Sequence, residues 1–166
     1  MKRAVAKWSL VLLCASMGAA IGGGLYEQIV LMPIWSASPP ASFTIIQPET
    51  GVPLQRFWIP VHTAITVFVP TALVAAWKDV TVRRLLLVGV ASYMVMRVWS
   101  RVFFIPEMLA FQQVSPDAPA SPELTARVER RTSMTVWREP LDMISFLSFA
   151  LALFWLRRSD DGGVWS

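Results

Sequence analysis

Long apolar runs divide the sequence into four segments that are each long enough to cross a lipid bilayer. They cover about residues 8–32, 57–77, 85–105 and 137–156. Each contains the ~20 residues that a helix needs to cross a hydrocarbon core of about 30 Å. An isolated hairpin would leave backbone groups unpaired in lipid, and no stretch of alternating polarity competes with the helical pattern. The pattern predicts an all-α integral membrane protein, a four-helix bundle forming a single domain over residues 1–166.

The polar connections differ in length and composition. The first connection contains four prolines within residues 36–56, which disfavour a continuous helix. The second is a tight loop. In the third, Ser121, Pro122 and Glu123 are typical of an N-cap, a first-turn proline and an acidic first turn. We expect a short surface helix there that ends at Glu129, so the first and third connections are long loops on one side of the bundle.

Basic residues flank the apolar segments in a pattern that predicts orientation. An even number of spans places the two termini and the second connection on one side, and few acidic residues dilute the basic ones there. The third connection is a counter-signal, because its basic residues are only partly offset by acidic ones. Three regions against one predict that both termini face the cytosol in a multi-pass protein of the plasma (inner) membrane. The agreeing basic residues are Lys2, Arg3, Lys7, Lys78, Arg83, Arg84, Arg157 and Arg158.

Composition supports the membrane class. Hydrophobic residues make up 55% of the 166 residues and charged residues 16%, whereas soluble domains carry about 25% charged residues. A net charge of +4 and a pI near 9.8 by themselves suggest a nucleic-acid partner. The basic residues lie beside apolar segments rather than on one polar face, so we expect a lipid bilayer as partner and no nucleic acid. The single cysteine, Cys14, excludes an internal disulfide.

The first segment has two further interpretations. Basic residues before an apolar run, with small residues over 15–20, resemble a signal peptide, but apolarity continues to Pro33, which favours an uncleaved helix. Gly18 and Gly22 are four residues apart, a spacing that lets two helix backbones approach closely. We favour packing of this glycine face against another helix of the same chain. The alternative is a homodimer through Gly18 and Gly22.

Ionisable residues occur in the outer half of the predicted spans and not in the inner half. Glu27 lies near the outer end of the first span, and His62 lies about 7 Å below the start of the second. Arg97 and Arg101 lie in the outer half of the third span, and Asp142 lies in the first turns of the fourth. A charge on a spanning helix costs roughly 2.5–3.5 kcal/mol, so it usually faces partners or water inside a bundle. We therefore expect one polar layer.

Each of these residues also has a structural explanation. Glu27 and Arg101 can extend to the interface, Asp142 suits a helix N-terminus, and a lone histidine is commonly a hydrogen-bonded structural residue. Arg97 is the deepest charge and needs an arranged partner. The common depth of all of them favours a functional site over these separate explanations.

Metal binding is weakly supported. His62 and Cys14 lie at opposite depths and cannot share a metal, and the arginines disfavour a site made of His62, Glu27 and Asp142. Haem ligation by His62 and a methionine stays open on composition alone. Nucleotide-binding and hydrolase motifs are absent from the sequence. We expect no metal site and no cofactor.

Several short motifs resemble the anthrone-oxygenase-like family of small four-span membrane proteins. The likeness covers most of the chain in topology. Its residues are Gly22-Gly23-Gly24-Leu25-Tyr26-Glu27 with Pro33 and Trp35, His62, the stretch from Tyr93 to Arg101, Phe103-Phe104-Ile105-Pro106-Glu107, and Arg138 to Asp142.

The resemblance implies a cofactor-independent oxidation of a hydrophobic phenol or anthrone, in which a base removes a proton and the enolate reacts with oxygen. His62 would be the base, and Arg97 and Arg101 would stabilise the anion. Nothing in the sequence identifies an aromatic polyketide as the substrate. The remaining candidate residues would contact this small hydrophobic ligand: Tyr26, Glu27, Tyr93 and Asp142.

A second hypothesis is a non-enzymatic membrane subunit or small transporter. The charged residues would then form a structural ion-pair lock or a proton or anion relay. An apolar cavity beside His62 and Arg97 favours an enzyme or a lipophile-binding protein. Fully paired charges without a cavity favour the structural role.

Overall fold

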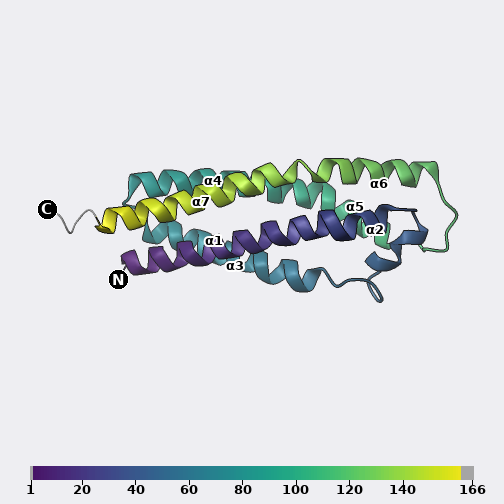
Figure 1. Ribbon diagram of the computed structural model, residues 1–166, viewed down its shortest axis with the longest axis horizontal. Coiled ribbons are helices and arrows are strands. Elements are labelled where there is room, and N and C mark those ends of the chain that lie inside the picture. The colour runs from purple at the N-terminus through teal and green to yellow at the C-terminus, as the bar shows by residue number, and fades with distance from the viewer. Residues whose placement is uncertain (1, 162–166) are drawn as a thin grey trace.

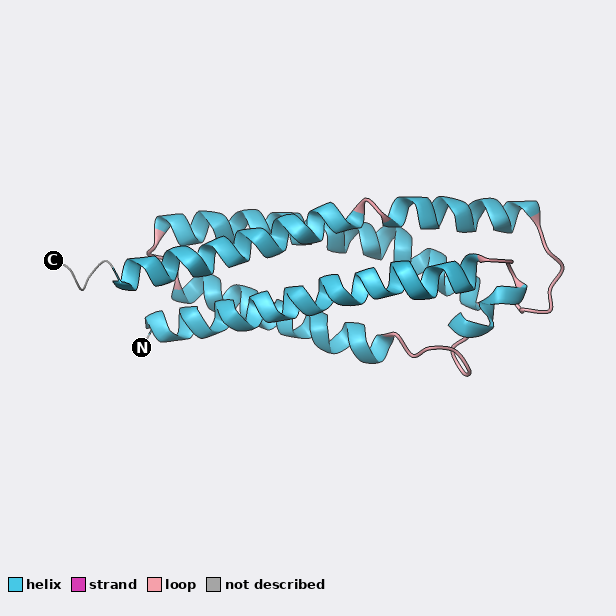
Figure 2. Cartoon of the chain, viewed as in Figure 1, coloured by secondary structure: helices cyan, strands magenta, loops and turns pink. Residues whose placement is uncertain are grey.

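The computed structural model describes the backbone of residues 2–161 and the side chains of residues 2–158, and every regular element in this part of the chain is a helix (Figure 2). Four stretches are long and apolar enough to cross a membrane, namely Lys2–Ser36, Gln55–Ala75, Val80–Gln112 and Pro122–Arg158. The predicted all-α architecture with four apolar helices is therefore confirmed. These helices indicate a membrane protein.

The helices begin earlier or end later than the apolar pattern predicts. Three of the four stretches contain 33 to 37 residues, which at 1.5 Å per residue exceeds a hydrocarbon core of about 30 Å. The elements are α1 (Lys2–Tyr26), η1 (Glu27–Leu31), α2 (Met32–Ser36), η2 (Ala41–Ile46), α3 (Gln55–Ala75), α4 (Val80–Trp99), η3 (Ser100–Phe104), α5 (Ile105–Gln112), α6 (Pro122–Thr135) and α7 (Arg138–Asp161).

The four long helices pack in the order α3, α1, α7, α4. α1 packs against both α3 and α7, and α4 packs against α7, whereas α3 and α4 barely touch. Figure 1 shows the described ends of α1 and α7 at the same end of the bundle as the loop between α3 and α4. α2, α5 and α6 lie at the opposite end, which we call the head.

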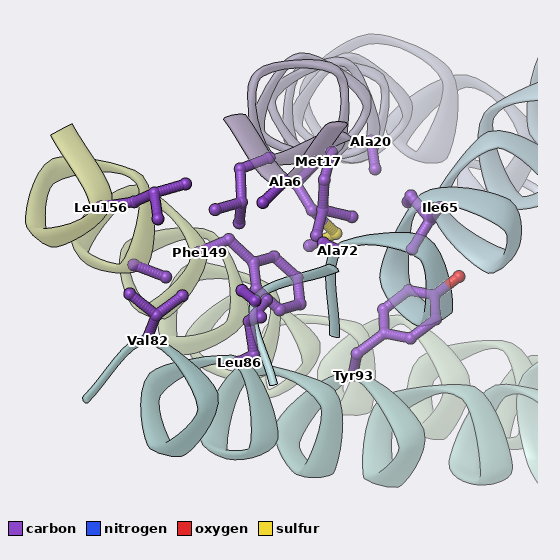
Figure 3. Packing of buried hydrophobic residues seen from close by; sticks show 14 of the residues in the cluster. Ala6, Met17, Ala20, Ile65, Ala72, Val82, Leu86, Tyr93, Phe149 and Leu156 are labelled. Carbon is purple, nitrogen blue, oxygen red and sulfur yellow. The ribbon is translucent and has the colours of Figure 1, made fainter. Parts of the chain in front are cut away.

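The main core fills the half of the bundle near the termini. Figure 3 shows the ring of Phe149 among side chains from α1, α3 and α4. Gly89 permits this close packing, because an added Cβ would lie 2.5 Å from Cε1 of Phe149. Tyr93 lies at the outer edge of the cluster with its hydroxyl directed toward α3 (Figure 3). The buried members on α1 are Ala6, Leu10, Leu13, Met17 and Ala20.

Two wide π-helical turns interrupt the first and third spans at equivalent places. The N–H of Met32 donates to the carbonyl of Glu27, and the N–H of Ile105 donates to the carbonyl of Ser100. A proline follows immediately in each case, at positions 33 and 106. A proline ring clashes with the carbonyl four residues earlier, and a wider turn relieves that clash. Such turns are frequent at functional sites.

A second core holds the head together. Trp35, Phe43 and Phe111 pack with ring centroids 5.4 to 6.4 Å apart, and Ile46 and Val128 complete the cluster. The predicted surface helix begins at Pro122 as expected, with Ser121 capping the N–H of Leu124.

The end that the sequence predicts for this helix is wrong. α6 continues past Glu129 to Thr135, and only Val136 and Trp137 separate it from α7. The helix is extended because Val128, Arg131 and Thr135 are buried on one face against the rest of the head.

The glycines of α1 do not all pack as the sequence suggests. Gly18 and Gly22 are exposed, and a Cβ added at Gly22 would contact nothing within 4 Å. Gly23 faces the ring of Phe57 and Gly24 faces Glu139, and neither leaves room for a larger residue without a shift. The favoured packing within the chain is therefore wrong for Gly22, whereas a Cβ at Gly18 would lie 4.0 Å from Cε2 of Phe146 in α7. The homodimer through Gly18 and Gly22 stays a prediction.

Candidate functional site

Two adjoining cavities lie where the bundle meets the head. The smaller one, called here the polar pocket, has a volume of about 30 Å³. The larger one has a volume of about 580 Å³ and lies between α3 and the helix formed by α4, η3 and α5, so we call it the seam cavity. Both are lined by Glu27, Trp58, His62, Arg131 and Arg138.

The seam cavity has apolar walls and a charged end. The hydroxyls of Thr63 and Thr66 donate to carbonyls of their own helix at 2.7 Å, so both side chains have satisfied polar groups. Arg97, Arg131 and Arg138 reach the charged end together with Glu27. The apolar lining comes from Val52, Leu54, Ile59, Val67, Phe104, Ile105, Met108 and Leu109.

His62 is held in place from two sides. Its Nδ1 lies 2.9 Å from the hydroxyl of Tyr93, and its ring stacks on Trp58 with centroids 5.4 Å apart and planes 16° apart. The indole N–H of Trp58 in turn donates to Oε2 of Glu27 at 3.2 Å. Among the described residues no hydrogen bond engages Nε2 of His62. With Nδ1 occupied by Tyr93, Nε2 is the ring nitrogen that remains for a further hydrogen bond.

Two arginines reach the site from α6 and α7. The guanidinium of Arg131, a residue that is only 7% exposed, lies over the rings of Trp35 at 5.1 Å and Phe104 at 5.8 Å. The guanidinium of Arg138 lies 4.8 Å from the ring centroid of Phe104, and its Nη2 lies 4.0 Å from Sδ of Met96. The ring faces attract these cations without accepting conventional hydrogen bonds from their N–H groups. The Nε atoms of both are buried and without a hydrogen-bond partner among the described residues.

Carboxylates line the polar pocket behind His62. Asp142 is 8% exposed, and its Oδ1 is buried without a partner among the described residues. Glu139 accepts a hydrogen bond from Nε2 of Gln28 at 2.6 Å. Gly24 makes room for this group, because a Cβ there would lie 3.1 Å from Oε1 of Glu139. The pocket volume of about 30 Å³ is enough for roughly two water molecules that could satisfy these atoms.

Five of the seven residues predicted from the sequence come together. Glu27, His62 and Arg97 line the seam cavity, Asp142 lines the polar pocket, and Tyr93 holds His62. The common depth of ionisable side chains on four helices therefore does correspond to one layer, which we call the polar layer.

The structure does not bring Tyr26 and Arg101 to either cavity. Tyr26 is 58% exposed and Arg101 is exposed on η3. Within η3 the buried side chains are Ser100 and Phe104, so the residue that follows Ser100 lies on the outer face. Arg97 and Arg101 are four residues apart and would share one face of a regular helix, but the wide turn at Ser100 ends the regular winding between them.

Sequence reasoning missed Arg131 and Arg138 as site residues, and interpreted them as charges of the outer connection. A signal was present, because buried or half-buried positions recur at alternating spacings of three and four along α6 and α7. That spacing describes one continuous face of two helices that follow each other, with polar residues in its middle. The positions are Leu124, Val128, Arg131, Thr135, Arg138, Asp142, Ser145, Phe149, Ala152 and Leu156.

Metal-ligating side chains do not cluster in the part of the chain that is described. Groups of three or more His, Cys, Asp or Glu residues in metal-binding arrangement are absent there. Cys14 is a partly buried residue packed against the main core, remote in sequence from the polar layer. The described residues that line or support the two cavities offer imidazole, phenol, guanidinium and carboxylate groups.

No protein-family model, curated protein or solved structure matches this chain. The resemblance to the anthrone-oxygenase-like family thus stays a prediction from short motifs. The function has to be inferred from the two cavities and the side chains that line them.

Proposed function

We propose that this chain is a multi-pass membrane enzyme that binds a hydrophobic phenolic or enolisable molecule in the seam cavity and oxidises it with molecular oxygen, without a cofactor. The observation that carries the proposal is a cavity of about 580 Å³ with apolar walls and with His62, Arg97, Arg131 and Arg138 at one end. Small-molecule sites typically have this form, with volumes of about 300–1,000 Å³ and a few convergent polar groups.

His62 is the proposed base. When Nδ1–H donates to the oxygen of Tyr93, Nε2 carries the lone pair and takes a proton from the ligand. The electron-rich anion then transfers electrons to oxygen. For a ring CH₂ group the balance is R₂CH₂ + O₂ → R₂C=O + H₂O, in which one oxygen atom enters the carbonyl and the other leaves as water. Tyr93 is a positioning residue in this scheme.

The arginines supply the electrostatic stabilisation. Arg97, Arg131 and Arg138 bring positive charge to the end of the cavity where the anion forms. Arg131 and Arg138 line this end of the cavity, where their guanidinium groups would donate charge-assisted hydrogen bonds to the anionic oxygen of the ligand. Aromatic rings hold both guanidiniums in place before a ligand binds, so little reorganisation is needed.

The non-enzymatic alternative predicts paired charges and no cavity. The site has the opposite character, since Arg131, Arg138 and Asp142 line open space and each has a buried polar atom without a hydrogen-bond partner among the described residues. A relay of protons or anions would still be compatible with the polar pocket. Activity measurements therefore have to separate the two hypotheses.

We also propose that both termini face the cytosol and that the protein lies in the plasma (inner) membrane. Lys2 and Arg3 at the start of α1 and Lys78 in the loop between α3 and α4 line one hollow, so basic residues of these elements lie at the same end of the bundle. Basic residues favour the cytosolic side of spanning helices. The polar layer then lies in the outer half of the membrane, with the head outside.

The proposal is tested by oxygen consumption of the purified protein in nanodiscs supplied with anthrone. We expect wild type to exceed empty nanodiscs, and His62→Ala to lose at least about 100-fold, because a general base contributes about 10² to 10⁴ in rate. Thr71→Ala, on the same helix and outside both cavities, is the matched control. Equal rates for wild type and His62→Ala would reject His62 as the base. A wild-type rate no higher than that of empty nanodiscs would reject the oxidation.

A further inference from the structure

The seam cavity is open to the side of the bundle. α3 is held by α1 and α4 is held by α7, so few contacts close the gap between α3 and α4. The apolar wall of that gap is largely exposed, with Ile59 at 65%, Val67 at 54% and Leu109 at 53%. In a membrane these side chains face acyl chains. An exposed apolar groove of this kind is a candidate route for a lipophilic molecule.

Hydrogen bonds and an ion pair hold the parts of the head together. Nε2 of Gln112 donates to the carbonyl of Ile46 at 2.9 Å, and Nε2 of Gln47 donates to the carbonyl of Val114 at 3.3 Å. Arg127 forms an ion pair with Glu107 at 3.2 Å, which ties α6 to α5. These contacts fasten the head over the polar layer. Between the two walls of the seam, the hydrogen bond between His62 and Tyr93 joins α3 to α4 at the polar layer, and no further hydrogen bond or ion pair joins α3 to α4, η3 or α5 among the described residues.

The end of the seam cavity is cationic. Arg97, Arg131 and Arg138 line it, and Glu27 is the single carboxylate among its described lining residues. Glu27 already accepts the indole N–H of Trp58. The other two carboxylates of the polar layer, Glu139 and Asp142, line only the polar pocket behind. The cavity thus offers an anion three guanidinium groups at one end and apolar surface along the rest.

We propose that the ligand of the seam cavity is a single-chain amphiphile that enters sideways from the outer leaflet. The anionic group of this ligand lies against Arg131 and Arg138, and its aliphatic chain lies along α3 toward Val67. This inference rests on the proposed function, because it names the class of molecule that the same cavity takes. A phenolic or enolisable group at the end of such a chain would bring the reacting atoms to His62.

Geometry favours one chain over two. Val67 lies five residues below His62, or about 7.5 Å along the helix, so the groove leads from the polar layer into the hydrocarbon region. Both lie on one wall of a single cavity of about 580 Å³. That volume suits one small molecule or chain rather than a whole two-chain phospholipid.

The test uses quenching of Trp58 fluorescence by 5-doxyl-stearic acid in phosphatidylcholine nanodiscs. Trp58 stacks on His62 and lines the cavity, and its emission is obtained as the difference between wild type and Trp58→Phe. We expect saturable quenching by the acid and only weak, non-saturating quenching by its uncharged methyl ester. Equal quenching by acid and ester would overturn the proposal. So would saturable quenching by 5-doxyl-phosphatidylglycerol at the same mole fraction, since the occupant would then be a two-chain lipid.

Variants of the protein locate the anionic group and the aliphatic chain of the ligand. Arg131→Gln combined with Arg138→Gln should weaken the binding of 5-doxyl-stearic acid at least tenfold. Arg130→Gln changes an exposed neighbour on α6 and should leave this binding within twofold of wild type. Val67→Phe should also weaken the binding of the acid, whereas Val98→Phe, which changes an exposed valine on α4 outside the cavity, should not. If the double variant fails to fold, the comparison of acid with ester in wild type still decides. Unchanged binding in a folded double variant would contradict the proposal.

The outcome is separable from that of the proposed oxidation, because quenching needs neither oxygen nor turnover. Saturable quenching without oxygen consumption keeps the lateral site and rejects the oxidation. Oxygen consumption without selective quenching rejects the single-chain ligand and keeps the oxidation.

Discussion

The main core around Phe149 and the polar layer around His62 are built from the same four spans. In the main core apolar side chains fill the space, and glycine at position 89 lets α4 approach the Phe149 ring. In the polar layer the same helices carry arginines, carboxylates and two cavities. The helices also lose their regular winding there, at η1 and η3. One half of the bundle is optimised for packing and the other is not.

The two regions also differ in how their buried polar atoms are paired. Buried polar atoms without a protein partner are uncommon in folded proteins, and a water molecule, an ion or a ligand usually satisfies them. The three such atoms described are Nε of Arg131, Nε of Arg138 and Oδ1 of Asp142, all in the polar layer. Local rules of folding are followed in the main core and broken at the candidate site, as expected for proteins in which function opposes stability.

The largest loss of stability is expected in the main core. Phe149→Ala should lower the free energy of unfolding by about 3 kcal/mol, because a fully buried ring leaves a cavity that its neighbours cannot fill. Phe154→Ala, on the same helix and 55% exposed, is the control and should change it little. Reversible unfolding in mixed detergent micelles measures both. Equal losses for the two would mean that the packing around Phe149 is not the source of stability.

A smaller loss is expected at the boundary of the two regions. Tyr93→Phe removes the hydrogen bond to Nδ1 of His62 and should lower the free energy of unfolding by about 1 kcal/mol. It should also reduce kcat for anthrone oxidation with little change in KM, because His62 loses its orientation rather than its ligand contact. An increase in KM alone would show that Tyr93 contacts the ligand instead of positioning the base.

In the polar layer a charge can be removed with little effect on stability. Arg131→Met should change the free energy of unfolding by less than about 1 kcal/mol, because loss of the cation–π contacts is offset by removal of a desolvated charge. Binding of 5-doxyl-stearic acid should fall in the same variant. A destabilisation as large as that of Phe149→Ala would make Arg131 a structural residue and would favour the ion-pair lock.

The smallest effect is expected on the exposed face of α1. Gly22→Leu should change the free energy of unfolding by less than about 0.5 kcal/mol, because an added side chain meets nothing. Gly23→Leu is the contrasting variant, since Phe57 occupies that space. Crosslinking in nanodiscs then tests the homodimer: a dimer that Gly22→Leu leaves intact does not form through this face.

The apolar pattern predicted the helical class and the approximate positions of four spans, because length and hydropathy are properties of the chain alone. It also predicted a layer containing Glu27, His62, Arg97 and Asp142, since depth along a straight helix follows from residue number. It could not predict which side of a helix faces inward after an irregular turn. Arg101 was placed beside Arg97 for that reason, and the wide turn at Ser100 turns it outward.

The sequence by itself determined where along each span the ionisable residues lie, because lipid tolerates only long apolar helices and confines charge to a few depths. Only the tertiary structure decided which of those residues share a space. Packing of α3 on α1 and of α4 on α7 leaves the α3–α4 side open. The near-continuous path of α6 into α7 brings Arg131 and Arg138 into that opening. Contacts between helices far apart in the chain set both features, and no local pattern encodes them.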